Sequence, residues 1–165
     1  MNPNDLYLLL LSDSVGLVNK AIEELRLLPV TEAIAIFERL SNEKESNFRC
    51  RAVHRLSLIS PKQAEVMALR LLSDSDAAVR WTSCETLWKL GSKKAVSKIG
   101  ELLVTDPNEL VRSFAAFSLG ELGDETVIPL LNQAMQNDTG VDHEGVAIRE
   151  TAKKAIQSIR LRTTN

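Results

Sequence analysis

A dipeptide made of one apolar residue and one arginine recurs along the chain, and it constrains the fold more than any other feature. It occurs as Phe48-Arg49, Val79-Arg80, Val111-Arg112 and Ile148-Arg149, so the arginines are 31, 32 and 37 residues apart. A small residue follows three positions later and an aliphatic residue seven positions later, as Ala52, Ser83, Ala115 and Ala152, then Leu56, Leu87, Leu119 and Ile156. These offsets lie on one helical face, and self-similarity at such a period is typical of a solenoid.

A second helix is predicted after each of the first three of these helices. Ser60-Pro61 and Asp106-Pro107 each begin a sequence typical of a capping box. Gly91 and Gly123 stand where the preceding helix is expected to end in a left-handed turn. Since no useful stretch alternates with period two, the sequence predicts an all-α fold: a right-handed α-solenoid of about four to five helix pairs.

The chain is expected to form a single domain over residues 1–165. We assign residues 1–14 to an N-terminal cap. The predicted repeats are residues 15–44, 45–74, 75–106 and 107–137, and residues 138–165 hold an insertion loop and a C-terminal capping helix. Atypical end units are what a solenoid requires, because its internal repeats bury their apolar faces only against neighbours.

Two stretches resemble the short HEAT-like repeat of phycobilisome lyases. One is residues 74–80, Asp-Ser-Asp-Ala-Ala-Val-Arg, continued by Leu87, Leu90 and Gly91; the other is residues 111–124 with Val127, Pro129 and Leu130. The resemblance extends over roughly residues 45–160. It implies a HEAT-like solenoid that binds a protein partner, either a phycobiliprotein or a second HEAT-repeat subunit. Its alternative implication is a subunit of a lyase that attaches or removes a bilin on a phycobiliprotein cysteine.

Composition and motifs favour a non-catalytic scaffold or adaptor. The formal net charge is −2, which disfavours nucleic acid as the partner. The chain has no glycine-rich phosphate loop, metal-spaced cysteine pair or nucleophile elbow. We therefore assign no catalytic residue, cofactor or metal. The apolar run Leu6–Leu11 is too short for a signal sequence or a membrane span, so we expect a cytoplasmic location.

Four aromatic residues occupy positions at which the repeat pattern does not require a core residue: Trp81, Trp88, Phe114 and Phe117. Trp81 and Trp88 are seven residues apart and share one flank of their helix. The four rings either form an exposed apolar patch that binds a partner, or they fill the space between adjacent repeats and complete the core.

Two further surfaces are candidates for partner contact. The second helices are expected to form the inner face of the solenoid, where Lys94 and Lys98 would be turned outward. The longer last interval suggests an insertion at about residues 138–145, which includes Asp142, His143 and Glu144. That insertion is either an ordinary surface loop or a partner-contact loop.

The recurring arginines have both a functional and a structural interpretation. Four guanidinium groups one repeat apart could bind a row of phosphates or carboxylates. Alternatively, each arginine pairs with an acid or a carbonyl at the start of a neighbouring repeat, and we favour this interpretation because arginine suits bidentate, half-buried pairing.

Overall fold

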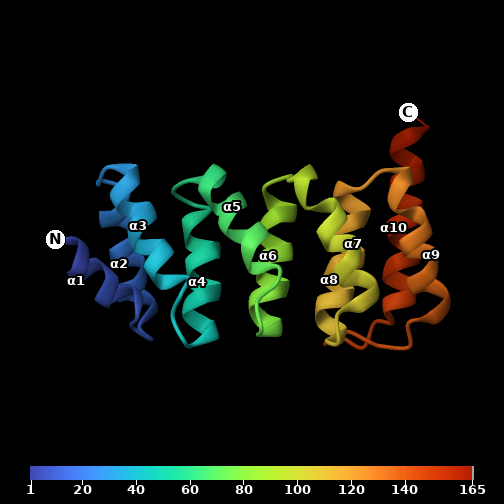
Figure 1. The fold of residues 1–165 in the computed structure, drawn as a ribbon, viewed down its shortest axis with the longest axis horizontal. Helices are drawn as coiled ribbons and strands as arrows, with labels where there is room; N and C mark the ends of the chain where they lie inside the picture. Colours follow the sequence, from blue (N-terminus) through green and yellow to red (C-terminus); the bar gives the residue numbers. More distant parts are fainter. Residues whose placement is uncertain (165) are drawn as a thin grey trace.

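The computed structural model describes residues 1–164, and every named secondary-structure element in this range is a helix (Figure 1). The helices are α1 Pro3–Leu10, α2 Val15–Leu25, α3 Val30–Leu40, α4 Ser46–Leu56, α5 Pro61–Leu71, α6 Ala77–Lys89, α7 Val96–Thr105, α8 Glu109–Leu122, α9 Ile128–Asn137 and α10 Ile148–Thr163. Short 3-10 turns at Lys93–Ala95 and Glu125–Val127 lead into α7 and α9. The predicted all-α solenoid is confirmed.

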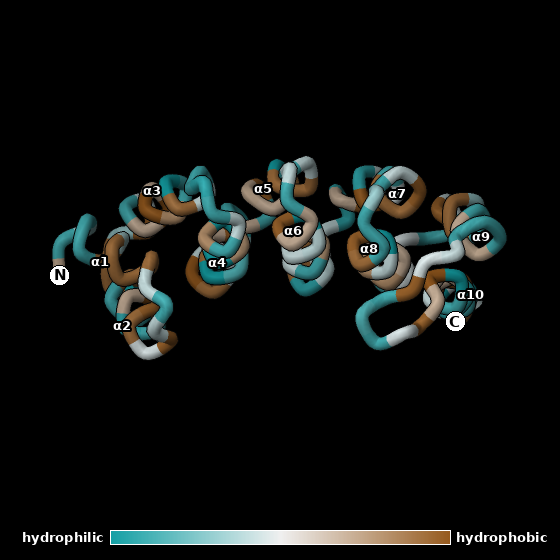
Figure 2. The backbone as a smooth tube through the Cα atoms, turned by 90° about the horizontal axis from the view of Figure 1, so that it is seen from below, coloured by the Kyte–Doolittle hydropathy of each residue, from teal (hydrophilic) through white to brown (hydrophobic). Residues whose placement is uncertain are grey.

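The helices form two layers that run the length of the molecule. The first helices of the pairs, α2, α4, α6 and α8, continue into α10 and make one layer, while the second helices α3, α5, α7 and α9 make the other (Figures 1 and 2). Figure 2 shows that the stack is bent and that the layer of first helices lies on the inside of the bend. The expectation that the second helices form the inner face is therefore wrong, because they lie on the convex side.

One apolar core passes through all the repeats. The residues three and seven positions after each recurring arginine are buried. All of them except the polar Ser83 belong to a cluster of buried apolar residues that extends from Leu6 to Ile159. A single helix pair could not bury its apolar faces on both sides. The core becomes continuous because α4 packs against α6, α6 against α8, and α8 against α10.

Helix α1 packs against α2 and α3 and buries Leu6, Tyr7 and Leu10. The Tyr7 hydroxyl donates a hydrogen bond to Glu43, and the guanidinium carbon of Arg39 lies 3.6 Å from the Tyr7 ring centroid. These contacts place α1 over the first helix pair.

The two predicted glycine turns differ. Gly91 has a φ of +68°, as expected for the end of a helix in the left-handed region. Gly123 has a φ of −74° and a ψ of 170°, so the prediction for this residue is wrong. A Cβ at Gly123 would lie 2.6 Å from both the Leu119 carbonyl oxygen and Val127 Cγ2. This glycine is therefore suited to a close approach of α8 to the turn that precedes α9.

Candidate functional site

Three of the recurring arginines form ion pairs with an aspartate at the junction with the next repeat. Arg80 is typical: its Nε lies 2.7 Å from Oδ2 of Asp106 and its Nη2 lies 2.8 Å from Oδ1. Its Nη1 donates to the carbonyl oxygens of Asp74 and Ser75 at 2.9 and 3.1 Å. The same arrangement joins Arg49 to Asp74 and Arg112 to Asp138.

The carboxylates of these pairs also order the start of the next repeat. Asp106 Oδ1 accepts the backbone N–H of Asn108 at 2.9 Å, and Asn108 in turn caps α8 by accepting from Leu110 and Val111. Asp106 was expected to begin a capping box, but the N-cap residue is Asn108.

These Arg–Asp pairs support the structural interpretation of the arginines. The Arg112 and Asp138 side chains are only 17% and 8% exposed. The hydrogen bond from Arg112 lowers the pKa of the Asp138 carboxyl, and the same bond raises the pKa of Arg112. Three of the four guanidinium groups are thus already bound to carboxylates and are not free to hold a ligand.

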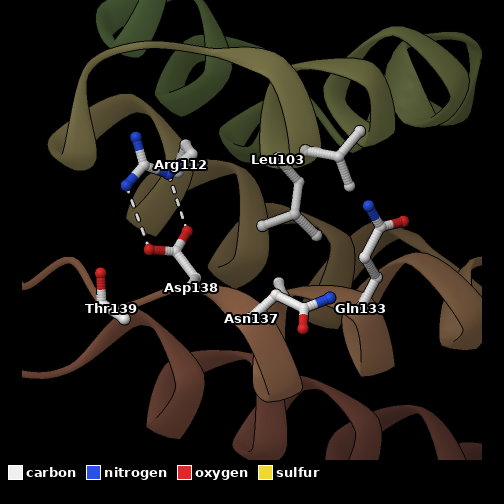
Figure 3. A pocket seen from close by; sticks show the side chains of 8 residues that line it. Leu103, Arg112, Gln133, Asn137, Asp138 and Thr139 are labelled. Atoms are coloured by element: carbon white, nitrogen blue, oxygen red, sulfur yellow. Dashed lines mark hydrogen bonds and ion pairs between the residues drawn. The ribbon is translucent and has the colours of Figure 1, made fainter.

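A shallow pocket of about 250 Å³ lies beside the last of these pairs (Figure 3). Leu103 of α7 and Gln133 and Asn137 of α9 line it together with Arg112 and Asp138. A similar hollow lies one repeat earlier, beside Arg80 and Asp106. Because the hollow recurs at successive repeats, it results from the way that the repeats stack. It therefore does not mark a specific binding site.

The four predicted aromatic residues come together in two pairs that bridge α6 and α8. The ring centroids of Trp81 and Phe114 are 5.0 Å apart, and those of Trp88 and Phe117 are 4.8 Å apart in an edge-to-face arrangement. Trp88 and Phe114 also pack against the buried core. Phe117 remains 40% exposed, and the other three rings are half-buried. We call these four residues the aromatic cluster.

The aromatic cluster therefore combines both interpretations of the sequence. The rings fill space between repeats, and each stays partly open to solvent. At the next interface, Ser113 and Gly120 of α8 occupy the positions that Trp81 and Trp88 occupy on α6. A Cβ at Gly120 would lie 2.8 Å from the Cα of Ala155, so α8 and α10 are in close contact where α6 and α8 are separated by rings.

The exposed surface of Phe117 faces the concave side. α6 packs against α5, and α8 packs against α7. The sides of α6 and α8 that face this layer of second helices carry fully buried residues such as Leu87 and Leu119. Phe117 is two positions before the buried Leu119 and therefore about 200° around α8 from it. Its exposed surface is thus turned away from the second helices, toward the side that forms the inside of the bend in Figure 2.

Charged residues adjoin the aromatic cluster on the same helices. Glu85 lies one turn from both Trp81 and Trp88, and Glu121 lies one turn after Phe117. The Glu85 carboxylate is paired with Nζ of Lys89 at 2.7 Å. Carboxylates therefore stand next to the rings on α6 and on α8.

The insertion between α9 and α10 is a short hairpin. Asp142 N–H donates to the Val146 carbonyl oxygen at 2.9 Å, and Ile148 N–H donates to the Gly140 carbonyl oxygen at 3.1 Å. Figure 2 shows this segment on the concave side, beside α8 and α10. Because Asp138 belongs to an Arg–Asp pair, the inserted residues begin after Gly140, later than expected from the sequence.

Within the hairpin, the three predicted contact residues differ in availability. The Asp142 carboxylate accepts the backbone N–H groups of Glu144 and Val146 at 2.9 Å and lies 3.4 Å from the Ser113 hydroxyl. His143 and Glu144 are exposed, with side-chain exposures of 64% and 72%. Asp142 thus stabilises the turn, while His143 and Glu144 are available to a partner.

Lys94 and Lys98 lie far from this surface in the fold, because both belong to the convex layer. Lys94 pairs with Glu65 at 3.0 Å, and Lys98 donates to the Leu69 carbonyl oxygen at 3.3 Å. Both lysines thus contact the preceding repeat, and the structure does not bring them together with the aromatic cluster.

Sequence comparison agrees with this architecture. A family profile for HEAT repeats matches residues 64–150, which is more than half of the chain. The chain belongs to the HEAT-repeat family. A search of curated proteins found no match. HEAT repeats commonly act as protein-interaction scaffolds.

Neither a membrane span nor a metal centre is found in the part of this HEAT-repeat chain that the structure describes. None of the helices within residues 1–164 is both long enough and apolar enough to cross a membrane. The same residues contain no group of three or more His, Cys, Asp or Glu side chains arranged to hold a metal ion.

Proposed function

We propose that this HEAT-repeat chain is a non-catalytic scaffold that binds a segment of a partner protein on its concave side, at the aromatic cluster. The observation that carries this proposal is the pairing of four rings across α6 and α8, with Phe117 left 40% exposed. Partly exposed aromatic side chains held rigid by their neighbours are typical of interface hot spots.

The aromatic cluster is suited to binding because its rings are already held in place before a partner binds. Each ring is held by its partner ring and, for Trp88 and Phe114, by the core. Rigid aromatic side chains lose little conformational entropy when a partner covers them. The hairpin stands at the edge of the same concave surface and supplies polar contacts through His143 and Glu144.

The test compares two exposed apolar residues on opposite sides of the molecule. The tagged protein is first used to recover its partner from the native cell, and the partner is then purified. Phe117→Ala is expected to weaken binding to that partner by about ten-fold or more. The matched control is Val66→Ala on α5 of the convex layer, where Val66 is 55% exposed. Equal affinities of the two variants would contradict the proposal.

The resemblance of residues 74–80 and 111–124 to repeats of phycobilisome lyases makes a phycobiliprotein the first partner to test, with the chain acting as its chaperone or adaptor. A second HEAT-repeat subunit is the other candidate. Gel filtration with each purified candidate distinguishes them, because a complex elutes earlier than either component.

The same resemblance supports the alternative function of a bilin lyase subunit. This alternative predicts that free bilin shifts its absorbance when mixed with the protein and apo-phycobiliprotein. An unchanged spectrum, both with and without apo-phycobiliprotein, would remove the lyase function and leave the scaffold function standing.

A further inference from the structure

The fourth recurring arginine, Arg149 of α10, differs from the other three because no carboxylate pairs with it within residues 1–164. Its side chain is exposed. In each complete pair, an arginine of a first helix binds the aspartate that comes directly after the next second helix, as Arg80 of α6 binds Asp106 after α7. Arg149 is therefore one half of a further junction of the same kind.

The opposite end of the solenoid carries an aspartate without an arginine. Residues 10–14 and residues 71–75 have the same sequence, Leu-Leu-Ser-Asp-Ser. Each stretch follows a helix that begins with proline, α1 or α5, and leads into a first helix, α2 or α6, although the turn after Asp13 is one residue shorter. Asp74 binds Arg49 of the preceding repeat. Asp13 is exposed and forms no ion pair with any residue that the structure describes.

The order of the helices makes these two ends complementary. Because α1 precedes the junction with α2, it takes the place of a second helix, while α10 at the other end of the stack is a first helix (Figure 1). A second copy placed after α10 would supply α1 as the next second helix and Asp13 as the next junction aspartate. Such a heterologous contact can repeat from one copy to the next.

The side of α10 that faces away from α8 is basic. Ala155 lies against Gly120 of α8, and residues two positions from Ala155 are about 200° around the helix from it. The exposed residues on this far side are Arg149, Glu150, Lys153, Gln157 and Arg160. Three cations there outnumber one acid, and α9, the other helix at this end, carries no charged residue. The acids outside α10 at this end belong to the hairpin and to the turn before α9.

The α1–α2 end offers the opposite charge. Glu23 and Arg26 pair with each other at 2.8 Å. The other charged residues of positions 3–26 are Asp5, Asp13, Lys20 and Glu24. Outside its ion pair with Arg70, α3 adds one acid and one cation, Glu32 and Arg39. Acids therefore outnumber cations at this end when every charge of the first three helices is counted.

Exposed apolar residues are also concentrated at the α1–α2 end. It holds six of the eleven large apolar residues that are exposed within residues 1–164: Met1, Leu8, Val15, Leu17, Leu27 and Val30. Leu8 is two positions from both Leu6 and Leu10, which are buried, so it is turned away from the core. The aliphatic stems of arginine and lysine can cover such residues while their charged ends pair with acids.

We propose that copies of this chain associate head to tail, with α1 of one copy packed on the far side of α10 of another and Arg149 paired with Asp13 across the contact. The contact repeats the internal Arg–Asp junction between two copies. A symmetric contact of either end with itself is disfavoured, because it would bring two basic or two acidic faces together. The concave surface remains free, so this inference is independent of the proposed function.

Sedimentation velocity of the full chain over a range of concentrations tests the association. We expect species larger than a dimer as the concentration rises, and weaker association at high salt. Arg149→Glu and Asp13→Arg each place like charges at the contact and are expected to weaken it by about ten-fold or more. An equimolar mixture of the two variants should associate again, because each contact then joins opposite charges.

Lys154→Glu is the matched control. It makes the same change of charge on α10, but Lys154 is next to Ala155 in sequence and lies off the far side, so association should be unchanged. Far-UV circular dichroism verifies that all variants keep their helices. A monomer at every concentration, a dimer that does not grow, equal effects of Lys154→Glu and Arg149→Glu, or a mixture that stays dissociated would each overturn the inference.

Discussion

At the residue scale, the Arg–Asp pairs are the contacts that fix one repeat relative to the next. Each arginine joins three segments: its own helix, the turn before that helix, and the aspartate at the junction with the next repeat. The Arg80 and Asp106 side chains are 11% and 2% exposed. A charge in such a position is costly to leave unpaired, so each pair penalises any arrangement that separates the repeats.

Replacing Arg80→Leu is therefore expected to lower the free energy of unfolding by about 3 kcal/mol, because Asp106 would remain buried without its partner. The control is Arg70→Leu, since Arg70 and Glu38 form a pair whose side chains are 46% and 44% exposed. That exposed pair is expected to contribute less than about 1 kcal/mol. Urea unfolding followed by circular dichroism measures both, and equal losses would contradict the structural role of Arg80.

The Arg112–Asp138 pair predicts how the free energy of unfolding depends on pH. The hydrogen bond from Arg112 holds the pKa of Asp138 below its ordinary value in the folded protein. A depressed folded-state pKa contributes stability above the unfolded-state pKa, which is about 3.9. This contribution is lost as the pH falls through the lower folded-state pKa.

Comparing the wild type with Asp138→Asn isolates this contribution. The difference in the free energy of unfolding should be constant above about pH 5 and should shrink as the pH falls below about 4. Urea unfolding at a series of pH values measures it. A difference that grows at low pH would have the wrong sign for a carboxylate stabilised in its charged form.

At the scale of elements, the spacing between neighbouring concave helices follows from the side chains between them. Trp81 and Trp88 of α6 meet rings of α8, whereas Ser113 and Gly120 occupy the same positions of α8 and allow α10 to come close. Large residues at one interface and small ones at the next give the two interfaces different widths. The aromatic cluster stays partly open where the helices are held apart.

Replacing Gly120→Ala is expected to destabilise the protein by about 1 to 3 kcal/mol, because the new methyl group would overlap the backbone of α10. Gly16→Ala in α2 is the control: the nearest heavy atom to its Cβ would be the Ser14 hydroxyl oxygen at 3.8 Å. That change should be neutral or should stabilise α2 by up to about 1 kcal/mol. Thermal unfolding of both variants checks the expectation, and a stabilised Gly120→Ala variant would show that α8 and α10 are not in close contact.

The hairpin is expected to be dispensable for folding. Val141 and Ala147 are bridged across its base, so deleting residues 142–146 joins two segments that already lie side by side. The main interaction lost outside the hairpin is the 3.4 Å contact of Asp142 with Ser113. Helix content should be unchanged by circular dichroism, and the free energy of unfolding should change by less than about 1 kcal/mol. A collapse of helix content would show that the hairpin belongs to the core structure.

At the scale of the whole molecule, the period of the arginines was enough to predict the stack. The small and aliphatic residues at fixed offsets from each arginine had to lie on one helical face, and they are buried as that pattern requires. The acids that complete the Arg–Asp pairs were missed, although Asp74, Asp106 and Asp138 recur at intervals of 32 residues. These aspartates form a second sequence repeat with nearly the same period as the arginines, and this repeat is sufficient to identify them as candidate partners.

The direction of the bend could not be predicted from the same periodicity. A repeat pattern specifies which residues are buried, but the curvature depends on how wide each interface is in each of the two layers. That width is set by particular contacts, such as the ring pairs of α6 and α8 and the approach of Gly120 to Ala155. For this reason the sequence pattern places Lys94 and Lys98 on the wrong side of the solenoid. The same pattern does not decide whether the rings of the aromatic cluster are exposed or buried.

Site-specific photo-crosslinking tests the central claim most directly. A photoreactive phenylalanine analogue is placed at Phe117 on the concave side or at Val66 on the convex side, and each protein is irradiated in the native cell. We predict a discrete protein adduct from position 117, reduced when Trp81 is also replaced by alanine, and no such adduct from position 66. An adduct formed at position 66 and not at position 117 would contradict the claim that the concave side binds the partner.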